Sequence, residues 1–179
     1  MTQTKKSIQQ TFMKLYDKYD YNKITIKNLC ENIPIARTTF YSYYTNIDEV
    51  KCDIEDQLIH GLLEVTHNIS KGNIPNMDFM LFLDATQSYI EENWDWIYIF
   101  LVKQENHRFI NKWKNAISDN FRKRYPLKQN IKNYELISEL IASATISAYT
   151  YWLKYPNKVK KEDMKTIIKE TLDAIVEII

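Results

Sequence analysis

The chain has 179 residues with only two glycines and four prolines, a composition that favours long helices over a turn-rich β architecture. The net charge is +1, but residues 1–47 carry seven basic and three acidic side chains (net +4), whereas residues 48–99 carry two basic and eleven acidic ones (net −9). The longest uncharged run, residues 140–153, is too short to cross a bilayer, and the polar start of the chain lacks an apolar signal region, so we expect a cytoplasmic protein.

The N-terminal part of the chain predicts three helices joined by short turns. Apolar residues at helical spacing place the first helix at about residues 4–19. Thr25 offers an N-cap oxygen to a second helix that runs to Asn32. Pro34 ends this helix, because a proline restricts the residue before it to extended geometry. A third helix follows at about residues 36–43.

The segment Thr25–Tyr44 therefore predicts a helix, a tight turn and a second helix. In a helix-turn-helix protein, the second of these helices enters the major groove of DNA. The basic balance of residues 1–47 suits contact with phosphate groups, and the acidic stretch that follows would repel DNA. We therefore expect the DNA-binding surface to be confined to the N-terminal part.

Side-chain chemistry assigns roles within this segment, although ordinary solvated residues are the competing interpretation. Arg37 is suited to a bidentate contact with guanine or to a phosphate. The neighbouring threonines let the helix approach and offer hydroxyls to base edges, while tyrosine hydroxyls suit phosphate oxygens. Thr25 caps its helix and offers the helix N-terminus to a phosphate. The predicted DNA-binding residues are Thr25, Ala36, Arg37, Thr38, Thr39, Tyr41 and Tyr43.

A long fourth helix is predicted to begin at Asn46, which forms a capping-box pattern with Glu49, and to end near residue 70. A loop is expected at residues 72–76. Hydrophobic periodicity then predicts helices at about residues 77–92, 94–103, 105–124, 131–155 and 161–178. The expected fold is all-α with about nine helices: a three-helix bundle with the helix-turn-helix at residues 1–47, and a second helical domain at residues 48–179.

The last two predicted helices are apolar over more than one face, because residues such as Leu140 and Ile167 add to the main apolar stripes. So much apolar surface has to pack both inward and onto a partner, and a second copy of the chain is the economical partner. The candidate dimer-interface residues are Ile137, Ile141, Ala144, Ala148, Ile168, Leu172 and Ile175.

The N-terminal segment resembles the DNA-binding motif of the tetracycline-repressor (TetR) family of bacterial transcription regulators. With the first helix, the resemblance covers about a quarter of the chain. The matching residues are Thr25 at the start of the second helix, Leu29, the triplet Thr39-Phe40-Tyr41, Tyr44 and the run Asp48-Glu49-Val50. The C-terminal remainder matches the family only in length and helical character.

The resemblance implies a homodimer with an all-α ligand-binding domain, in which the last two long helices dimerise. It also implies that a small molecule bound in the C-terminal core shifts the fourth helix, changes the separation of the two recognition helices and releases operator DNA. The expected function is therefore that of a ligand-responsive repressor. The expected partners are double-stranded operator DNA, a second copy of the chain and an unidentified small-molecule effector, without a membrane.

Three positions depart from the family pattern. Pro34 stands where the family usually has glycine, Ala36 where it has serine or threonine, and Ile47 where lysine is frequent. Ala36 removes an N-cap oxygen worth ~1 kcal/mol, and Ile47 removes a phosphate-binding charge. We expect weaker or geometrically altered DNA binding. An alternative function therefore stays open: a co-regulator that acts through protein–protein contacts with weak or absent DNA binding, as some family members do.

Aromatic residues of the second half are candidates for the walls of an effector pocket, and core packing is the competing interpretation for each of them. Two basic clusters, 112–114 and 122–124, either attract an anionic effector or form a solvated face. The candidate pocket residues are Trp94, Trp96, Tyr98, Phe100, Trp113, Tyr149 and Trp152.

No pattern in the sequence indicates catalysis, a cofactor or a metal ion. Cys30 and Cys52 fit no metal-binding spacing and are expected to be buried thiols. His60, Glu64 and His67 share one helix face, but the two histidines lie two turns apart, too far to share one ion easily. The sequence has no glycine-rich phosphate loop and no nucleophile–base pair, so we do not expect an enzyme.

Overall fold

The computed structural model describes residues 2–70, 79–124 and 133–177, and these residues form helices and short connections without a β-strand. The all-α fold predicted from the sequence is therefore confirmed. The chain divides into two compact units, Met1–Leu58 and Ile59–Ile179. The division falls within a long helix, so the first turns of that helix belong to the N-terminal unit. The loop expected at residues 72–76 lies outside the described residues.

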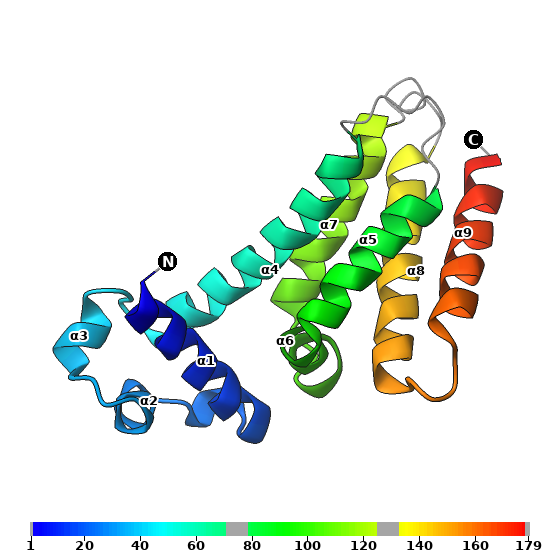
Figure 1. The fold of residues 1–179 in the computed structure, drawn as a ribbon. Helices are drawn as coiled ribbons and strands as arrows, with labels where there is room; N and C mark the ends of the chain where they lie inside the picture. The colour runs from blue at the N-terminus through cyan, green and yellow to red at the C-terminus, as the bar shows by residue number, and fades with distance from the viewer. Residues whose placement is uncertain (1, 71–78, 125–132, 178–179) are drawn as a thin grey trace. The chain divides into compact units, whose positions relative to one another are not determined.

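The N-terminal unit consists of three α-helices, one short 3₁₀ turn and the first part of α4 (Figure 1). Its elements are α1 (Gln3–Lys18), η1 (Tyr21–Lys23), α2 (Ile26–Asn32), α3 (Arg37–Tyr41) and α4 (Ile47–Ser70). One apolar side of each α-helix faces the interior of the unit. The apolar side chains that are fully excluded from solvent are Ile8 and Phe12 of α1, Leu29 of α2, Phe40 of α3, and Val50 and Ile54 of α4.

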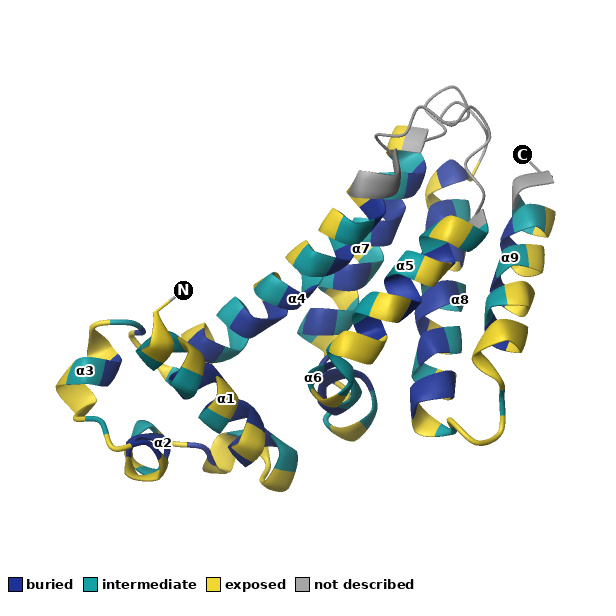
Figure 2. Ribbon diagram, viewed as in Figure 1, coloured by how far each residue is buried: buried dark blue, intermediate teal, exposed yellow. Residues whose placement is uncertain are grey.

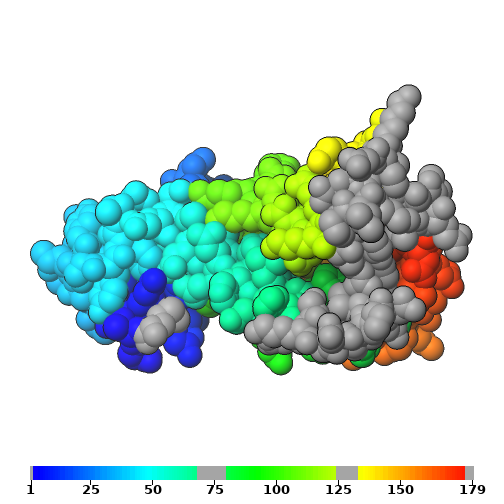
Figure 3. Space-filling model, turned by 90° about the horizontal axis from the view of Figure 1, so that it is seen from above, coloured from blue at the N-terminus to red at the C-terminus, as the bar shows by residue number. Residues whose placement is uncertain are grey.

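The C-terminal unit is a bundle of helices around an aromatic core (Figure 1, Figure 2). Besides the second part of α4, it contains α5 (Phe79–Glu92), α6 (Trp94–Tyr98), η2 (Ile99–Lys103), α7 (His107–Arg124), α8 (Tyr134–Lys154) and α9 (Lys161–Glu177). Among the helices of this unit, α8 packs most extensively against α7 and then against α9. The second part of α4 lies beside α7 in both the ribbon and the space-filling view (Figure 1, Figure 3).

Most helices agree with the sequence prediction to within a few residues, and two differences are informative. The helix predicted at 94–103 is α6 followed by the π-helical turn η2, because the hydrogen bonds of the chain widen at Ile99–Lys103. The helix α3 ends at Tyr41 instead of residue 43, and the backbone turns there through bonds from the amides of Tyr43 and Tyr44 to the carbonyl of Phe40.

No helix in the described part of the chain combines the length and the apolar character needed to cross a membrane.

Candidate DNA-binding surface and ligand cavity

The start of α2 has the cap that the sequence predicts, in a more complete form. The amide of Asn28 donates to the Thr25 hydroxyl oxygen (3.2 Å), and the Thr25 amide donates to Oδ1 of Asn28 (2.7 Å). This reciprocal capping box fixes where α2 begins. The predicted approach of a DNA phosphate to the N-terminus of α2 at Thr25 stays a prediction.

The turn between α2 and α3 is built around Pro34. Ile33 is the C-cap of α2 in extended geometry (φ −122°, ψ 132°), as the proline after it requires. The amide of Ile35 donates to the carbonyl of Ile33 at 2.6 Å, which closes a three-residue turn with Pro34 at its centre. Such a turn needs a negative φ near the value that the proline ring imposes, so this turn does not require glycine.

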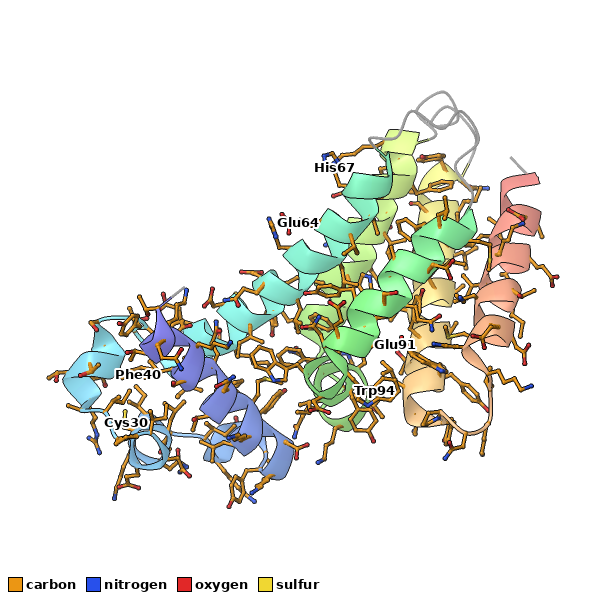
Figure 4. All side chains as sticks on the ribbon, viewed as in Figure 1. Cys30, Phe40, Glu64, His67, Glu91 and Trp94 are labelled. Atoms are coloured by element: carbon orange, nitrogen blue, oxygen red, sulfur yellow. The ribbon has the colours of Figure 1, made fainter. Side chains whose placement is uncertain are left out.

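Ala36 is the N-cap residue of α3, and it makes no side-chain cap hydrogen bond. The expected loss of the cap at this position is therefore confirmed. On α3, Arg37, Thr38 and Tyr41 are exposed and lie on the outer side, with the Tyr41 side chain 56% exposed. Phe40 is fully buried and points into the unit (Figure 4). This split between a buried aromatic and three exposed polar residues defines the outer face of α3.

Two further predicted DNA contacts are less exposed. Thr39 and Tyr43 are both half-buried. The side-chain hydrogen bonds of Tyr43 with Thr2 and Thr4 lower its pKa, so its hydroxyl is held at the start of α1. Tyr44 is buried, as predicted for the inner side of the motif.

A polar cluster around Asp53 ties the motif to α4. The carboxylate oxygen Oδ2 of Asp53 accepts hydrogen bonds from Tyr44 Oη (2.7 Å) and Gln9 Nε2 (2.8 Å). Lys5 Nζ lies 2.9 Å from the same oxygen. Burial and the hydrogen bond to Asp53 raise the pKa of Tyr44, so this tyrosine stays protonated as a donor. The sequence reasoning missed this cluster.

The start of α4 carries part of the predicted capping box. The Glu49 amide donates to Oδ1 of Asn46 at 2.9 Å, as predicted. The return bond differs, because the Glu49 carboxylate accepts from the amide and the hydroxyl of Thr45 instead of the Asn46 amide. These bonds from Thr45 lower the pKa of Glu49, so the negative charge is favoured at the N-terminus of the helix.

Four of the seven aromatic residues predicted to line an effector pocket pack against one another in two pairs in the C-terminal unit. Phe100, Trp113, Tyr149 and Trp152 are buried, whereas Trp94, Trp96 and Tyr98 are half-buried. The rings of Trp113 and Tyr149 stack at 5.9 Å, and Trp94 meets Trp152 edge-on at 5.1 Å. Tyr149 Oη also donates to the carbonyl of Leu83 at 3.3 Å. Packing against each other accounts for most of these rings.

A small cavity lies among α4, α5, α7 and α8 of the C-terminal unit. Of the seven aromatic candidates, Trp113 is the one that lines this cavity. Its volume is about 20 Å³, counted as the space that the centre of a water-sized sphere can occupy, which is enough for a water molecule. The wall residues are Leu62, Leu63, Thr66, Phe82, Thr86, Trp113, Ala116, Ile117, Asn120 and Thr145. The polar members of this set carry no periodic signal that sequence reasoning could have used.

The predicted dimer-interface residues divide into two groups. Ile141, Ile168 and Leu172 are buried against the helices of their own unit. Ile137, Ala144, Ala148 and Ile175 are half-buried. The large apolar side chains that are exposed on the same two helices are Leu136, Leu140 and Tyr151 of α8 and Ile167 of α9. The apolar surface open to a partner therefore lies beside the predicted stripe.

The cysteine and histidine residues are distributed as follows. Cys30 is buried, as predicted, and burial raises the pKa of its thiol. Cys52 is half-buried, so the prediction of a buried thiol was wrong for it, and its thiol donates to Asp56 at 3.6 Å. Glu64 and His67 project from the outer side of α4 (Figure 4). Among the described residues, no three potential metal ligands lie together.

Comparison with solved structures shows that the chain has the fold of TetR-family transcriptional regulators over 94–98% of its length. The TetR transcriptional regulator from Streptococcus agalactiae 2603V superposes with a TM-score of 0.71 at 21% identity, over 94% of this chain and 93% of that chain. The fatty acid degradation regulator FadR from Bacillus halodurans gives 0.67 at 11% identity, over 98% and 95%. The dihydroxyacetone kinase operon activator DhaS gives 0.58 at 19% identity, over 98% and 95%.

No protein-family model and no curated protein sequence matches the chain. The likeness to the solved structures is therefore one of fold, with a helix-turn-helix at the N-terminus and a helical unit after it.

Proposed function

We propose that the protein is a transcriptional regulator that binds double-stranded operator DNA through α2 and α3 and acts in the cytoplasm, where that DNA lies. The observation that carries the proposal is the outer side of α3, where Arg37, Thr38 and Tyr41 are exposed on a helix anchored by the buried Phe40. A helix presented in this way after a tight turn is suited to the major groove. The fold shared with TetR-family regulators supports the same function.

The regulator acts as a homodimer in this proposal. Two copies of a helix-turn-helix read two half-sites on one side of the DNA, so the separation of the two recognition helices governs affinity. The exposed apolar residues of α8 and α9 supply a surface that a second copy would cover. A small molecule in the C-terminal unit then acts as the effector: it binds the DNA-incompetent form more tightly and releases the operator, which makes the protein a ligand-responsive repressor.

A direct test is a binding titration with the DNA upstream of the protein's own gene. The double variant Arg37→Ala/Tyr41→Phe should bind at least about tenfold more weakly, because it loses one base or phosphate contact of about 1–3 kcal/mol and one tyrosine hydroxyl. Its affinity should also fall less steeply with salt concentration, because one phosphate-pairing cation is gone.

Lys154→Ala is the matched control, because it removes one exposed cation from α8 in the other unit. This control should bind DNA with unchanged affinity. Equal affinity of the double variant and the wild type at two salt concentrations would remove α3 from the DNA-binding surface.

A second function is a co-regulator that acts through protein–protein contacts with weak or absent DNA binding. The absence of a side-chain cap at Ala36 and the brevity of α3, which has five residues, favour this alternative. A mobility shift with the same upstream DNA separates the two functions. A specific shift supports the regulator, and its absence at every protein concentration used supports the co-regulator.

A further inference from the structure

The helix α3 has few interactions of its own to hold it in place. It has five residues, and Ala36 offers no side-chain acceptor to the first amides of the helix. Phe40 is its one buried side chain (Figure 4). A helix this short is not stable in water without tertiary contacts. The position of α3 therefore depends on contacts made by the residues that flank it.

Tyr44 makes such a contact shortly after the end of α3. Its amide donates to the carbonyl of Phe40 at 3.1 Å, and the centroids of the two rings lie 6.0 Å apart. The Tyr44 side chain is 3% exposed, so its hydroxyl lies inside the unit and away from the surface proposed to meet DNA. Because both the backbone and the ring of Tyr44 contact Phe40, the position of this ring constrains the last turn of α3.

The hydroxyl of Tyr44 reaches α4, where it donates to Oδ2 of Asp53 at 2.7 Å. From α1, Gln9 Nε2 and Lys5 Nζ lie 2.8 Å and 2.9 Å from the same oxygen, so α1 also holds this carboxylate. Lys5 Nζ lies 5.5 Å from the centroid of the Tyr44 ring as well. A hydrogen bond to a charged carboxylate is stronger than one between neutral groups. The end of α3 is thus joined to a side chain that contacts two other helices.

We infer that Tyr44 and Asp53 are positioning residues for α3: the hydrogen bond between them holds the C-terminal end of this helix on α4 and supplies the order that Ala36 does not supply at the N-terminal end. The inference rests on the proposed function, because α3 is the helix proposed to enter the major groove. Tyr44 acts on DNA binding from inside the unit, through the orientation of α3, and does not touch DNA itself.

Hydrogen exchange of the DNA-free protein tests the bond. Tyr44→Phe keeps the ring and removes the donor. The amides of Phe40 and Ser42, which bond to carbonyls one turn earlier, should then exchange about fivefold faster. Fivefold corresponds to about 1 kcal/mol, the net value of one hydrogen bond. A contribution to overall stability alone would accelerate only the slowest amides, which exchange when the whole unit unfolds.

Tyr21→Phe is the matched control for this experiment. It also removes a tyrosine hydroxyl that donates to an aspartate of α4, in this case Asp48 at 3.2 Å. Tyr21 lies in η1, before α2, and has no bond to the end of α3 among the contacts described. The α3 amides of this variant should therefore exchange at the wild-type rate.

Two further variants test the partner of Tyr44 and the role of the missing cap. Asp53→Ala should accelerate exchange of the α3 amides, and adding Tyr44→Phe to it should have no further effect. Ala36→Ser adds an N-cap oxygen at a position whose backbone (φ −72°, ψ 152°) already has the extended geometry of an N-cap. In the Tyr44→Phe background, Ala36→Ser should restore slow exchange of the α3 amides.

A titration with the DNA upstream of the protein's own gene measures the consequence for binding. Tyr44→Phe should bind this DNA up to about fivefold more weakly than the wild type, because α3 is less well ordered. Its affinity should keep the wild-type dependence on salt concentration, because no cation that pairs with a phosphate is lost. Tyr21→Phe should bind with the wild-type affinity.

Three results would overturn the inference: an unchanged exchange rate of the α3 amides in Tyr44→Phe, an equal acceleration in Tyr21→Phe, or equal affinity of Tyr44→Phe and a wild type that binds the DNA specifically. The exchange experiment contains no DNA and is independent of the proposed function. If the exchange rates change as expected and the wild type binds no DNA, the positioning of α3 by Tyr44 and Asp53 stands and the proposed function fails.

Discussion

At the scale of single residues, Asp53 links α4 to two other parts of the N-terminal unit. Its carboxylate accepts hydrogen bonds from Gln9 of α1 and from Tyr44, which follows α3. Burial raises the pKa of Asp53, but the hydrogen bonds from Tyr44 and Lys5 outweigh burial and hold the pKa below its ordinary value. The charged carboxylate therefore stabilises the folded unit.

Asp53→Asn keeps the shape and removes the charge. We expect it to lower the free energy of unfolding by about 1 kcal/mol, a modest value because the side chain is partly exposed to water. Chemical denaturation at neutral pH measures the change. Asp56→Asn, an exposed position one turn further along α4, is the matched control and should leave stability within about 0.5 kcal/mol of the wild type.

The contribution of Asp53 should also depend on pH. A carboxylate whose pKa is lowered on folding stabilises the protein above its unfolded pKa of about 3.9 and loses this effect as the pH falls through the folded value. The difference in stability between the wild type and Asp53→Asn should therefore be full at neutral pH and narrow below about pH 4. A difference that grew on acidification would contradict the assigned role of Asp53.

At the scale of elements, a close contact joins α4 to α5 within the C-terminal unit. A Cβ atom added at Gly61 of α4 would lie 2.1 Å from the hydroxyl oxygen of Tyr89 on α5. The glycine therefore leaves the space in which the tyrosine ring rests on the helix. Burial of this ring raises the pKa of Tyr89, which agrees with its position between helices.

The effect of Gly61→Ala on stability should have opposite signs in the wild type and in a variant without the Tyr89 ring. In the wild type it should lower stability by about 1 kcal/mol, because displacing the Tyr89 ring outweighs the helix propensity that alanine gains. In a Tyr89→Ala background, the same change should raise stability by about 1 kcal/mol, the propensity difference alone. A denaturation cycle of the four proteins measures both values, and stabilisation in both backgrounds would show that the contact is unimportant.

At the scale of the whole molecule, the proposed dimer depends on the exposed apolar residues of the last two helices. Leu136, Leu140 and Tyr151 are spaced four and eleven residues apart, which brings them to one side of α8. Ile167 adds an exposed apolar side chain on α9. Covering this apolar surface with a second copy of the chain removes it from water and so lowers the free energy.

Leu140→Glu/Ile167→Glu should convert a dimer into a monomer, because it places two charges where two apolar surfaces would meet. Light scattering after size-exclusion chromatography measures the mass. The monomer should also bind operator DNA more weakly, since it engages one half-site at a time. Leu81→Glu, an exposed leucine on α5, is the control and should remain dimeric. If Leu81→Glu alone dissociates the dimer, the interface lies elsewhere.

The parts of the structure that the sequence predicted are those that depend on near neighbours. Thr25 and Asn28 lie three residues apart, so the start of α2 follows from local hydrogen bonding. Pro34 ends α2 through its own ring and its effect on the preceding residue. Helical periodicity likewise predicted most of the helices, since it reflects one helix at a time.

Tertiary structure decided the features that join distant residues. Gln9 and Asp53 are 44 positions apart, and Tyr149 reaches the Leu83 carbonyl across 66 positions. Both sides of α8 are apolar, so only packing against α7 and α9 decided that Ile141 is buried and Leu140 exposed. The sequence by itself determined a helical protein with a helix-turn-helix, because caps, turns and periodicity are local. The Asp53 cluster, the uncharged cavity and the exposed face of α8 required the fold, because their partners come together only when the helices pack.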